Sequence, residues 1–478
     1  MCGIVGLISL SENNIFFELF EALYHLQHRG QDSYGLSIFS KSNNLTSKTD
    51  KFITNSQKVG KQTTNIIKNK GLLLNSEIKN IDGHIGIGHV RYPTTGANTI
   101  KEAQPFIKQG IFHTIVLVHN GQIWKTNKVI EYFKIHKLQY EVKTDTELII
   151  NLLSFEFNKY KVLNNSIIIN IIKHITNLLE GSFSCICMIL NYGMVVFKDI
   201  RGIRPLIFGH KDDNYYLVSS ESVSLTCLDY KIVNDIYNEI IIFKNDIPGY
   251  SIYKNDTKKF SPCIFEWIYL ARVESILYNV PVYLARMKMG ESLVTKIQKE
   301  IKKDELNAID YIIPVPDTSK PAALAIANCL KIPYIEAIVK NRYINRTFIM
   351  DTQNKRKKNI KRKLNVVQSF IKNKNIMIVD DSIVRGNTIK HIINLLKKNE
   401  AKQIYIVSCS PRILYENKYG IDIPNKNELI AYKMSIKEME QFYGVKKIIF
   451  HDLGLIIKSI QEFNPNILQF ETSVFIGY

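Results

Sequence analysis

The first half of the chain alternates short apolar runs with turn residues. Clear examples are "CGIVGLISL" (residues 2–10), "TIVLVHNG" (114–121) and "FSCICMIL" (183–190). Runs of this length, rich in Ile and Val, predict β-strands. Helices are expected in "FFELFEALYHLQHRG" (16–30), which ends at a glycine, and in "TDTELIINLLSFEFNKY" (144–160), which opens with Thr and Asp. Many strands with few helices favour a layered α+β domain.

The second half has a different rhythm, in which strands and helices take turns. "DYIIPVP" (310–316), "KNIMIVD" (374–380) and "KQIYIVSCS" (402–410) predict strands, while "KPAALAIANCL" (320–330) and "TIKHIINLLKKNE" (388–400) predict helices. The apolar face of the last helix consists of Ile389, Ile392, Ile393 and Leu396. This alternation implies a parallel, doubly wound sheet.

The change of rhythm falls near residues 240–262, so we expect domains at 2–245 and 262–478. A chain of 478 residues is long enough for two or three domains. Residues 41–80 are rich in Asn, Lys, Ser and Thr and weakly patterned, which predicts a variable surface excursion.

Composition excludes several classes of protein. No stretch approaches the roughly 18 uninterrupted apolar residues of a membrane helix. The opening "MCGIVGLISL" lacks the basic region of a signal peptide, so a cytoplasmic location without a membrane partner is expected. The seven cysteines are scattered and form no C-x-x-C pair, which indicates neither a zinc site nor a disulfide framework.

The net charge of +19 raises the alternative of a nucleic-acid-binding protein. Because Lys, Asn and Ile are enriched along the whole chain, the charge is better explained by a compositional bias, and no nucleic-acid partner is expected. One cluster is local: residues 340–363 contain ten Lys or Arg and a single acid, Asp351.

The segment "IMIVDDSIVRGNT" (376–388) carries the clearest chemistry in the second half. An apolar strand ends in Asp380 and Asp381, and a small-residue loop then leads into a helix. Ligands of open α/β sheets bind at the carboxyl ends of the strands, and a helix N-terminus attracts phosphate. The two acids could hold ribose hydroxyls or Mg²⁺. The plain structural alternative is a capped turn.

Two further segments are expected at the same site. "PVPDTSKPA" (314–322) follows the neighbouring strand and could bring Asp317, Thr318 and Ser319 to the same rim. The basic run is too polar for a core and could close over a pyrophosphate, through the side chains of Lys340, Arg342, Arg346 and Lys363. If the paired acids and the phosphate loop were not nearby, the basic run would be explained as a solvated surface loop.

Cys2 raises the question of a nucleophile. If Met1 is removed, the Cys2 thiol and a free α-amino group lie on the same residue. The pKa of such an amino group, near 8, suits a general base. Arg91 in "GHVRYPTTG" is a partner for a carboxylate, and Asn120 with Gly121 in "HNG" could form an oxyanion hole. Asp145 in "KTDTE" could bind an ammonium group. This set describes hydrolysis of an amino-acid side-chain amide, with glutamine as the obvious substrate. An incidental second-position cysteine is the alternative.

The whole chain resembles the glutamine phosphoribosylpyrophosphate amidotransferase (amidophosphoribosyltransferase) family. The motifs that carry the resemblance are "MCGIVG", "LQHRGQDSYG", "GIGHVRYPTTG", "EAQPF", "HNG", "RGIRPL", "SSES", "FEWIYLAR", "PVPDTS", "KNRYINRTFI", "IVDDSIVRGNT", "YGIDIP" and "FETSVFIG". They run from the first residues to the C-terminus.

The resemblance implies an α+β N-terminal-nucleophile hydrolase (layered αββα) domain followed by an α/β type I phosphoribosyltransferase domain with a parallel sheet. Cys2 would release ammonia from glutamine, and the ammonia would travel inside the protein to convert phosphoribosylpyrophosphate to 5-phosphoribosylamine, the first committed step of purine biosynthesis. Asn120 and Gly121 would be the oxyanion hole, and Arg91 and Asp145 the glutamine clamps.

The same resemblance assigns the second site. Thr318, Asp380 and Asp381 match the family's Mg²⁺ positions, with one ion per subunit. The residues matching the phosphoribosylpyrophosphate site are Lys340, Arg342, Lys363, Asp380, Asp381, Arg385, Gly386, Asn387 and Thr388. The family is usually a homotetramer. One branch has a cleaved propeptide and an iron–sulfur cluster. Here Cys2 directly follows Met1, so no propeptide is expected, and Val223 stands where that branch has a cysteine, so no cluster is expected.

Two rival functions remain at this stage. Another amidotransferase with an N-terminal cysteine, making glucosamine phosphate or asparagine, would share the first half but lack the paired acids and phosphate loop. A regulator that binds phosphoribosyl ligands and nucleic acid without catalysis would explain the charge, but both sets of site residues are intact.

Overall fold

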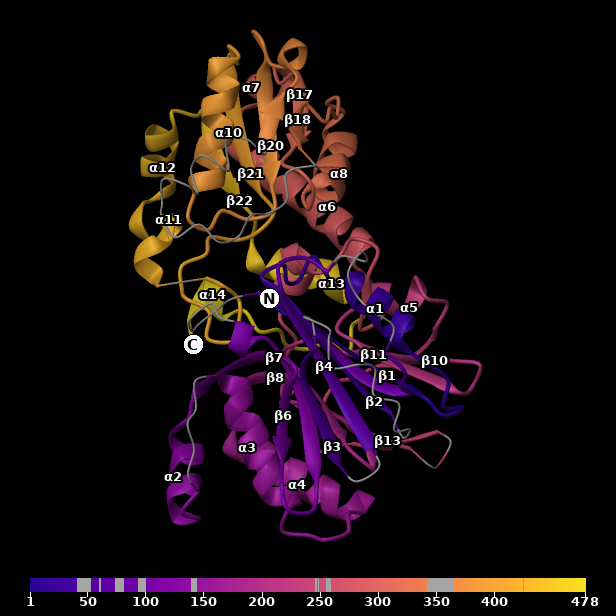
Figure 1. Cartoon of the computed structure of the whole chain (residues 1–478). Coiled ribbons are helices and arrows are strands. Elements are labelled where there is room, and N and C mark those ends of the chain that lie inside the picture. Colours follow the sequence, from indigo (N-terminus) through magenta and orange to yellow (C-terminus); the bar gives the residue numbers. More distant parts are fainter. Residues whose placement is uncertain are drawn as a thin grey trace. The chain divides into compact units, whose positions relative to one another are not determined.

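A computed structural model describes residues 1–40, 53–59, 62–73, 81–92, 100–138, 144–245, 247, 249–254, 259–341, 364–423 and 425–478 (Figure 1). The chain divides into two compact units. The first comprises Met1–Pro262 together with Lys418–Asp422, and the second comprises Cys263–Asn417 together with Ile423–Tyr478. The short segment Lys418–Asp422 therefore belongs to the first unit, although the chain on both sides of it belongs to the second.

The first unit is built on two antiparallel sheets. The eight-stranded sheet has the order β12 (Lys231–Asp235), β10 (Ile207–Lys211), β11 (Tyr215–Ser219), β1 (Gly3–Ser9), β5 (Ile85–Arg91), β2 (Ser33–Ser40), β4 (Gln62–Lys70) and β3 (Ile53–Val59). The six-stranded sheet has the order β14 (Tyr250–Tyr253), β13 (Ile240–Lys244), β9 (Gly193–Lys198), β8 (Glu180–Ile189), β7 (Thr114–Lys125) and β6 (Phe106–Gln109).

Helices cover the outer faces of both sheets. Apolar residues of α1 (Phe16–Tyr24) and α5 (Val223–Thr226) pack on the eight-stranded sheet. Those of α2 (Asn127–Ile135), α3 (Asp145–Phe157) and α4 (Asn165–Leu178) pack on the six-stranded sheet. The two sheets bury a third apolar layer between their inner faces. The layered αββα arrangement is therefore confirmed.

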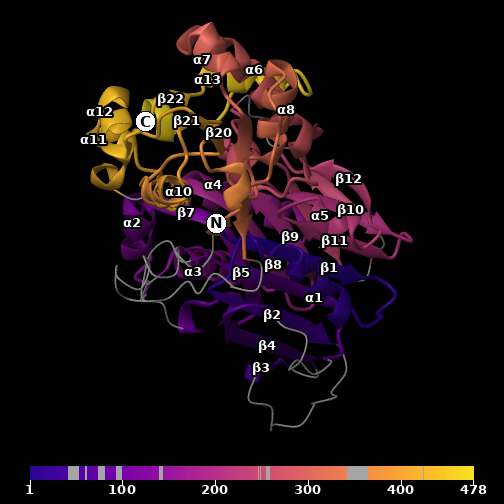
Figure 2. The same cartoon turned by 90° about the horizontal axis from the view of Figure 1, so that it is seen from above.

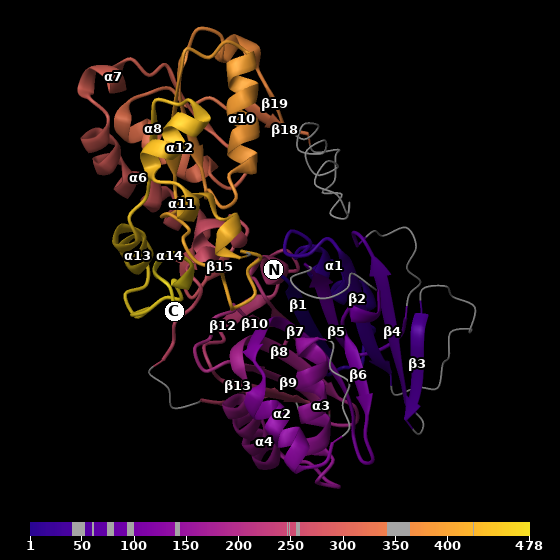
Figure 3. The same cartoon turned by 90° about the vertical axis from the view of Figure 1, so that its left-hand side faces the viewer.

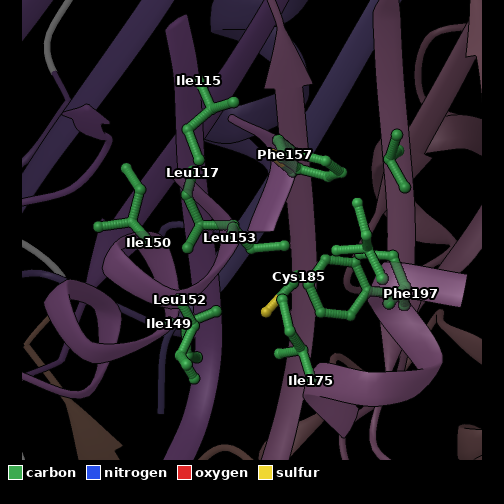
Figure 4. Packing of buried hydrophobic residues seen from close by; sticks show 14 of the residues in the cluster. Ile115, Leu117, Ile149, Ile150, Leu152, Leu153, Phe157, Ile175, Cys185 and Phe197 are labelled. Atoms are coloured by element: carbon green, nitrogen blue, oxygen red, sulfur yellow. The ribbon is translucent and has the colours of Figure 1, made fainter. Parts of the chain in front are cut away.

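Alternation along the strands places each side chain in one of these layers. In β7, Leu117 points into the helix-covered layer while Val118 points into the layer between the sheets. Figure 4 shows the helix-covered layer, in which Leu153 of α3 and Ile175 of α4 lie among sheet residues such as Cys185. Burial on both faces explains why these strands appear in the sequence as nearly continuous apolar runs.

Most elements expected in the first half are present. The helix expected from the opening of "TDTELIINLL" begins as α3, where Thr144 caps the helix and exchanges bonds with Glu147 in a capping box. The expectation of a surface excursion over residues 41–80 is wrong for part of that range, because β3 and β4 continue the eight-stranded sheet (Figure 3). Ile66 and Ile67 of β4 are buried.

The second unit has a four-stranded parallel sheet with the order β17 (Tyr311–Pro314), β20 (Asn375–Asp380), β21 (Gln403–Ser408) and β22 (Lys447–Phe450). Helices α6 (Val282–Glu300) and α8 (Lys320–Leu330) pack on one face. Helices α10 (Asn387–Lys398) and α12 (Ile436–Tyr443) pack on the other (Figure 2). The predicted doubly wound arrangement is confirmed, and the predicted apolar face of α10 is buried.

Smaller elements complete the described part of this unit. They are β15 (Ile276–Leu277), β16 (Val280–Pro281), α7 (Lys303–Asn307), β18 (Ile338–Lys340), β19 (Leu364–Val366), α11 (Ile430–Lys433), α13 (Leu453–Gln461) and α14 (Ser473–Ile476). Among the residues described in either unit, no helix is both long and apolar enough to cross a membrane.

Candidate active sites

Cys2 lies directly before β1, in the first unit. Its thiol is the donor to the backbone carbonyl of Tyr92, with 3.8 Å between Sγ and O. Its own carbonyl accepts a bond from Nε of Arg29 at 3.0 Å. Arg29 is buried and forms an ion pair with buried Glu221, which also contacts His28 at 2.7 Å. The residue before β1 is therefore connected to two distant segments. Arg29 and Glu221 occur in the family motifs, but no sequence pattern predicted this contact.

Asn120 and Gly121 lie within β7. Asn120 is 1% exposed, and among the described residues its Nδ2 group has no hydrogen-bond partner. A buried donor without a partner costs free energy, so such a group is typical of a site that a ligand completes. At Gly121 the backbone φ is +151°, and a Cβ would lie 2.0 Å from the carbonyl oxygen of Ser182. Only glycine fits at this point of the strand.

Two buried histidines lie beside this part of β7. His89 on β5 and His119, the residue before Asn120 on β7, are both buried and lie close to each other. Burial lowers the pKa of His89 well below its usual range, and burial lowers the pKa of His119 to about 4. Both rings are neutral at pH 7, and their role is to fill the interior next to Asn120.

The two proposed glutamine clamps occupy different surroundings. Arg91 donates to Glu102 at 2.6 Å and lies 3.6 Å from Asp32, while its Nη1 group makes no hydrogen bond to the described residues. Asp145 is the first residue of α3, where it accepts a bond from the N–H of Ile123 at 2.9 Å. Burial raises the pKa of Asp145 to about 6, against the opposing effect of that bond.

The segment Lys418–Asp422 is built into the same unit. The carbonyl of Tyr419 accepts bonds from Oγ of Ser182 at 2.7 Å and from Nε of Arg204 at 2.9 Å. Gly420 packs against the backbone of Gly121, where a Cβ would lie 3.1 Å from the carbonyl carbon. The hydroxyl of Tyr92 donates to Asp422 at 3.3 Å. No sequence pattern indicated that a segment from the second half would touch Gly121.

In the second unit, the acid pair follows β20 as the sequence predicts. Asp380 is buried and accepts a bond from the N–H of Asp381 at 3.0 Å, and Asp381 accepts one from Ser382 at 2.8 Å. Burial, followed by the charge of Asp381, raises the pKa of Asp380 well above its usual range. Two carboxyls therefore lie side by side at the carboxyl end of β20.

The loop before α10 has the geometry of an anion site. Gly386 has φ +76° and serves as the N-cap of α10. Its carbonyl accepts two bonds, from the N–H of Lys390 at 3.0 Å and from the buried hydroxyl of Tyr443 at 3.1 Å. Arg385 pairs with Glu428 at 2.8 Å. The support from Tyr443 was not visible in the sequence, because that residue lies on another helix.

The segment after β17 leaves the sheet at the same edge, since β17 and β20 are parallel neighbours with Pro314 opposite Val379. This segment contains Asp317 and Thr318. Lys340 pairs with Asp317 at 2.7 Å, so two residues expected at the pyrophosphate site are in contact. Arg342, Arg346 and Lys363 lie outside the described residues.

The fold and these sites together define a class of enzyme. The layered αββα unit carries a cysteine at position 2, directly before β1, and a buried amide at Asn120 whose Nδ2 has no partner among the described residues, a combination typical of amidotransferases with an N-terminal nucleophile. The second unit combines a parallel sheet, paired acids and a phosphate loop, as in phosphoribosyltransferases. A family model for a glutamine amidotransferase domain matches residues 89–227, and one for a phosphoribosyl transferase domain matches residues 284–431.

Relatives of known identity are similar over the whole chain. The amidophosphoribosyltransferase of Pasteurella multocida (strain Pm70) is 39% identical over 485 residues, which cover 100% of this chain and 92% of that protein. The one of Escherichia coli (strain K12) is 36% identical with the same coverage. The solved structure of the glutamine phosphoribosylpyrophosphate amidotransferase from B. subtilis, complexed with ADP and GMP, has a TM-score of 0.82 at 26% identity and covers 100% of this chain and 97% of that one.

The chain belongs to the amidophosphoribosyltransferase family. It is an enzyme of the first step of purine biosynthesis, a pentosyltransferase with glutamine amidotransferase activity. Glutamine and phosphoribosylpyrophosphate fit the family as its substrates, and phosphoribosyltransferases generally use Mg²⁺ with phosphoribosylpyrophosphate.

Proposed function

We propose that Cys2 is the nucleophile that releases ammonia from glutamine, after removal of Met1 makes its α-amino group free to act as the base. The Asn120 side chain and the Gly121 N–H stabilise the oxyanion, Arg91 binds the carboxylate of glutamine and Asp145 binds its ammonium group. The observation that carries this proposal is the buried Asn120 amide, whose Nδ2 has no partner among the described residues. A preorganised donor of this kind stabilises a developing negative charge.

We propose that the second unit binds phosphoribosylpyrophosphate between the acid pair and the phosphate loop. Asp380 and Asp381 bind the ribose hydroxyls, and the loop Arg385–Thr388 holds the 5-phosphate at the N-terminus of α10. Lys340, Arg342 and Lys363 contact the pyrophosphate. Because Lys340 pairs with Asp317 at 2.7 Å, pyrophosphate must compete with that carboxylate for the lysine.

The residues of this site fit one Mg²⁺ per subunit. Thr318, Asp380 and Asp381 offer oxygen atoms, which Mg²⁺ prefers, and Asp380 and Asp381 are adjacent carboxyls whose charges a dication would compensate. Among the described residues no three His, Cys, Asp or Glu side chains are grouped as a metal site. When bound, Mg²⁺ neutralises the leaving pyrophosphate.

We assign glutamine hydrolysis to residues 2–245 and phosphoribosyl transfer to residues 262–478, in a cytoplasmic homotetramer. No iron–sulfur cluster, nucleic acid or membrane takes part in this proposal. The ammonia released at Cys2 displaces pyrophosphate from C1 of phosphoribosylpyrophosphate, and 5-phosphoribosylamine, glutamate and pyrophosphate are the products.

The test measures glutamate and pyrophosphate release with Mg²⁺ and phosphoribosylpyrophosphate, using either glutamine or ammonium chloride as nitrogen donor. The native protein should release both products from glutamine. Cys2→Ala should lose the glutamine-dependent reaction and keep the ammonia-dependent one. Pyrophosphate release from glutamine by Cys2→Ala would refute the assignment of the nucleophile. Absence of pyrophosphate with either donor in the native protein would refute the assignment of the second site.

A further inference from the structure

We infer that Gln104 is a positioning residue for the oxyanion hole, because its side-chain amide holds the backbone of β7 immediately before Asn120. The inference rests on the role proposed above for Asn120. Gln104 has no proposed contact with the reacting atoms. It acts through His119, to which it is bound by two hydrogen bonds.

The two bonds form a closed pair between a side chain and a strand. Oε1 of Gln104 accepts from the N–H of His119 at 2.6 Å, and Nε2 of Gln104 donates to the carbonyl of His119 at 3.1 Å. A primary amide offers the same donor and acceptor as a peptide group. The Gln104 side chain therefore satisfies both backbone groups of one residue of β7, as a neighbouring strand would.

The register of the sheet explains why a side chain is needed there. In the antiparallel pair of β6 and β7, Phe106 is opposite Leu117. Continuing that register places Pro105 opposite Val118 and Gln104 opposite His119. Proline has no N–H to donate, so backbone pairing cannot continue through it. The amide of Gln104 extends the pairing to His119 after the backbone ladder ends at Phe106.

The other edge of β7 is already paired, since His119 is opposite Cys185 in β8. Gln104 thus supports the edge of β7 that faces away from β8. Gln104 is 8% exposed and His119 is 3% exposed, so water cannot easily replace the two bonds. Leaving two buried backbone groups unpaired would favour a local shift of the strand.

Such a shift would act directly on the next residue, Asn120. Among the described residues no hydrogen bond holds the Nδ2 group of Asn120. The position of that donor therefore depends on the backbone that carries it. Oxyanion donors must lie about 2.7–3.1 Å from the developing charge to be effective. The substrate clamps Arg91 and Asp145 lie on other elements, β5 and α3, and their own bonds go to Glu102 and Ile123 rather than to Gln104.

The experiment compares Gln104→Met, which keeps the length of the side chain and removes both bonds, with Asn158→Leu as a matched control. Asn158 makes the same kind of contact at the opposite end of the β6–β7 hairpin, where Oδ1 accepts from Phe112 at 2.7 Å and from His113 at 3.1 Å. Both substitutions remove side-chain hydrogen bonds to the β6–β7 hairpin, but only Gln104→Met removes them beside Asn120.

For Gln104→Met we expect kcat with glutamine to fall about 10- to 100-fold, the range for a displacement of up to 1 Å. KM for glutamine and the ammonia-dependent rate should change less than about twofold, because neither the clamps nor the second site are touched. The affinity for glutamate γ-semialdehyde, which forms a tetrahedral adduct with the thiol, should fall in parallel with kcat, whereas the affinity for glutamate should not. Asn158→Leu should lower the Tm and leave kcat unchanged.

Gln104→Glu gives an independent readout if the methionine variant does not fold. A protonated carboxyl can still accept from and donate to His119, whereas an ionised one loses the donor. The kcat of this variant relative to the native protein should therefore increase as the pH is lowered from 8 to 6. A flat ratio would overturn the inference.

A native kcat in Gln104→Met, or an equal loss of kcat in Asn158→Leu, would also overturn it. Asn120→Ala run in parallel separates this failure from failure of the proposed function. If Asn120→Ala lowers kcat and Gln104→Met does not, only the role of Gln104 is wrong. If Asn120→Ala itself has native kcat, the oxyanion role of Asn120 is wrong.

Discussion

The two candidate sites are assembled in opposite ways. In the first unit, Cys2, Arg91, Asn120 and Asp145 come from four separated segments. Cys2, Arg91 and Asp145 are bonded to residues of other segments, and the backbone directly before Asn120 is bonded to Gln104. In the second unit, Asp380 and the phosphate loop through Thr388 form one continuous strand, loop and helix. An antiparallel sandwich collects residues from distant strands, whereas a parallel sheet presents a local segment at the end of each strand.

Because of this difference, different kinds of substitution are expected to impair the two sites. The first site depends on long-range contacts such as the Arg29–Glu221 ion pair and the Gln104–His119 bonds. Substitutions far away in sequence should therefore damage its chemistry. The second site depends on its own backbone conformation, supported by Tyr443. Substitutions there should mainly weaken substrate binding.

The largest expected effect is a loss of activity at the first site alone. Asn120→Ala should lower the glutamine-dependent kcat by roughly 10²–10³-fold, the cost of losing one oxyanion donor. Steady-state assays with glutamine and with ammonium chloride measure this directly. The ammonia-dependent rate should stay native, and an equal loss with both nitrogen donors would mean that Asn120 supports more than glutamine hydrolysis.

The clamp at Asp145 should make the first site sensitive to pH. Its raised pKa of about 6 means that a growing fraction of the carboxyl becomes protonated, and unable to bind ammonium strongly, as the pH falls through 6. The Kd of glutamine should therefore be nearly constant above pH 7 and increase toward tenfold per pH unit below about 6. Calorimetry on Cys2→Ala avoids turnover. Asp145→Asn should bind weakly at every pH, and a persistent pH dependence in that variant would assign the effect to another group.

Gly386→Ala should test the backbone dependence of the second site. A Cβ would lie 2.2 Å from the Tyr443 hydroxyl, and φ +76° disfavours alanine by about 1–2 kcal/mol. We expect a lower Tm and a KM for phosphoribosylpyrophosphate raised about tenfold or more, a shift of about 1.4 kcal/mol, with glutamine affinity unchanged.

The double variant Gly386→Ala/Tyr443→Phe sharpens that result. It removes the hydroxyl that the new Cβ would meet, so the two substitutions should be less damaging together than the sum of their separate effects, by about 0.5–3 kcal/mol. Additive losses of stability would show that the contact with Tyr443 does not limit position 386.

The smallest effect is expected for Tyr443→Phe alone. The Gly386 carbonyl keeps its bond from Lys390, so the loss should be about 1 kcal/mol, or roughly fivefold in KM for phosphoribosylpyrophosphate. Tyr405→Phe is the matched control, since its hydroxyl donates to Gln403 at 3.1 Å near the start of β21. A change in kcat with ammonia but not in KM would contradict a supporting role for Tyr443 in phosphate binding.

Local sequence patterns were enough to predict most helices and strands and the phosphate site of the second unit. Short apolar runs placed the strands, and the opening Thr144 and Asp145 placed the start of α3. The continuous run from Asp380 to Thr388 identified a phosphate loop because all its residues act within one local segment. The sequence also named Cys2, Asn120 and Asp145 as candidates through their neighbours in the chain.

Only the tertiary structure decided which distant segments support those candidates. It brought Gln104 to His119, Glu221 to Arg29, Tyr443 to Gly386 and Lys418–Asp422 into the first unit. It also placed β3 and β4 in the sheet, where pairing with β2 outweighed a weak local pattern. The physical reason is common to all of these cases: hydrogen bonds between residues far apart in the chain leave no periodic trace in the sequence, because each depends on where the folded chain brings its partner.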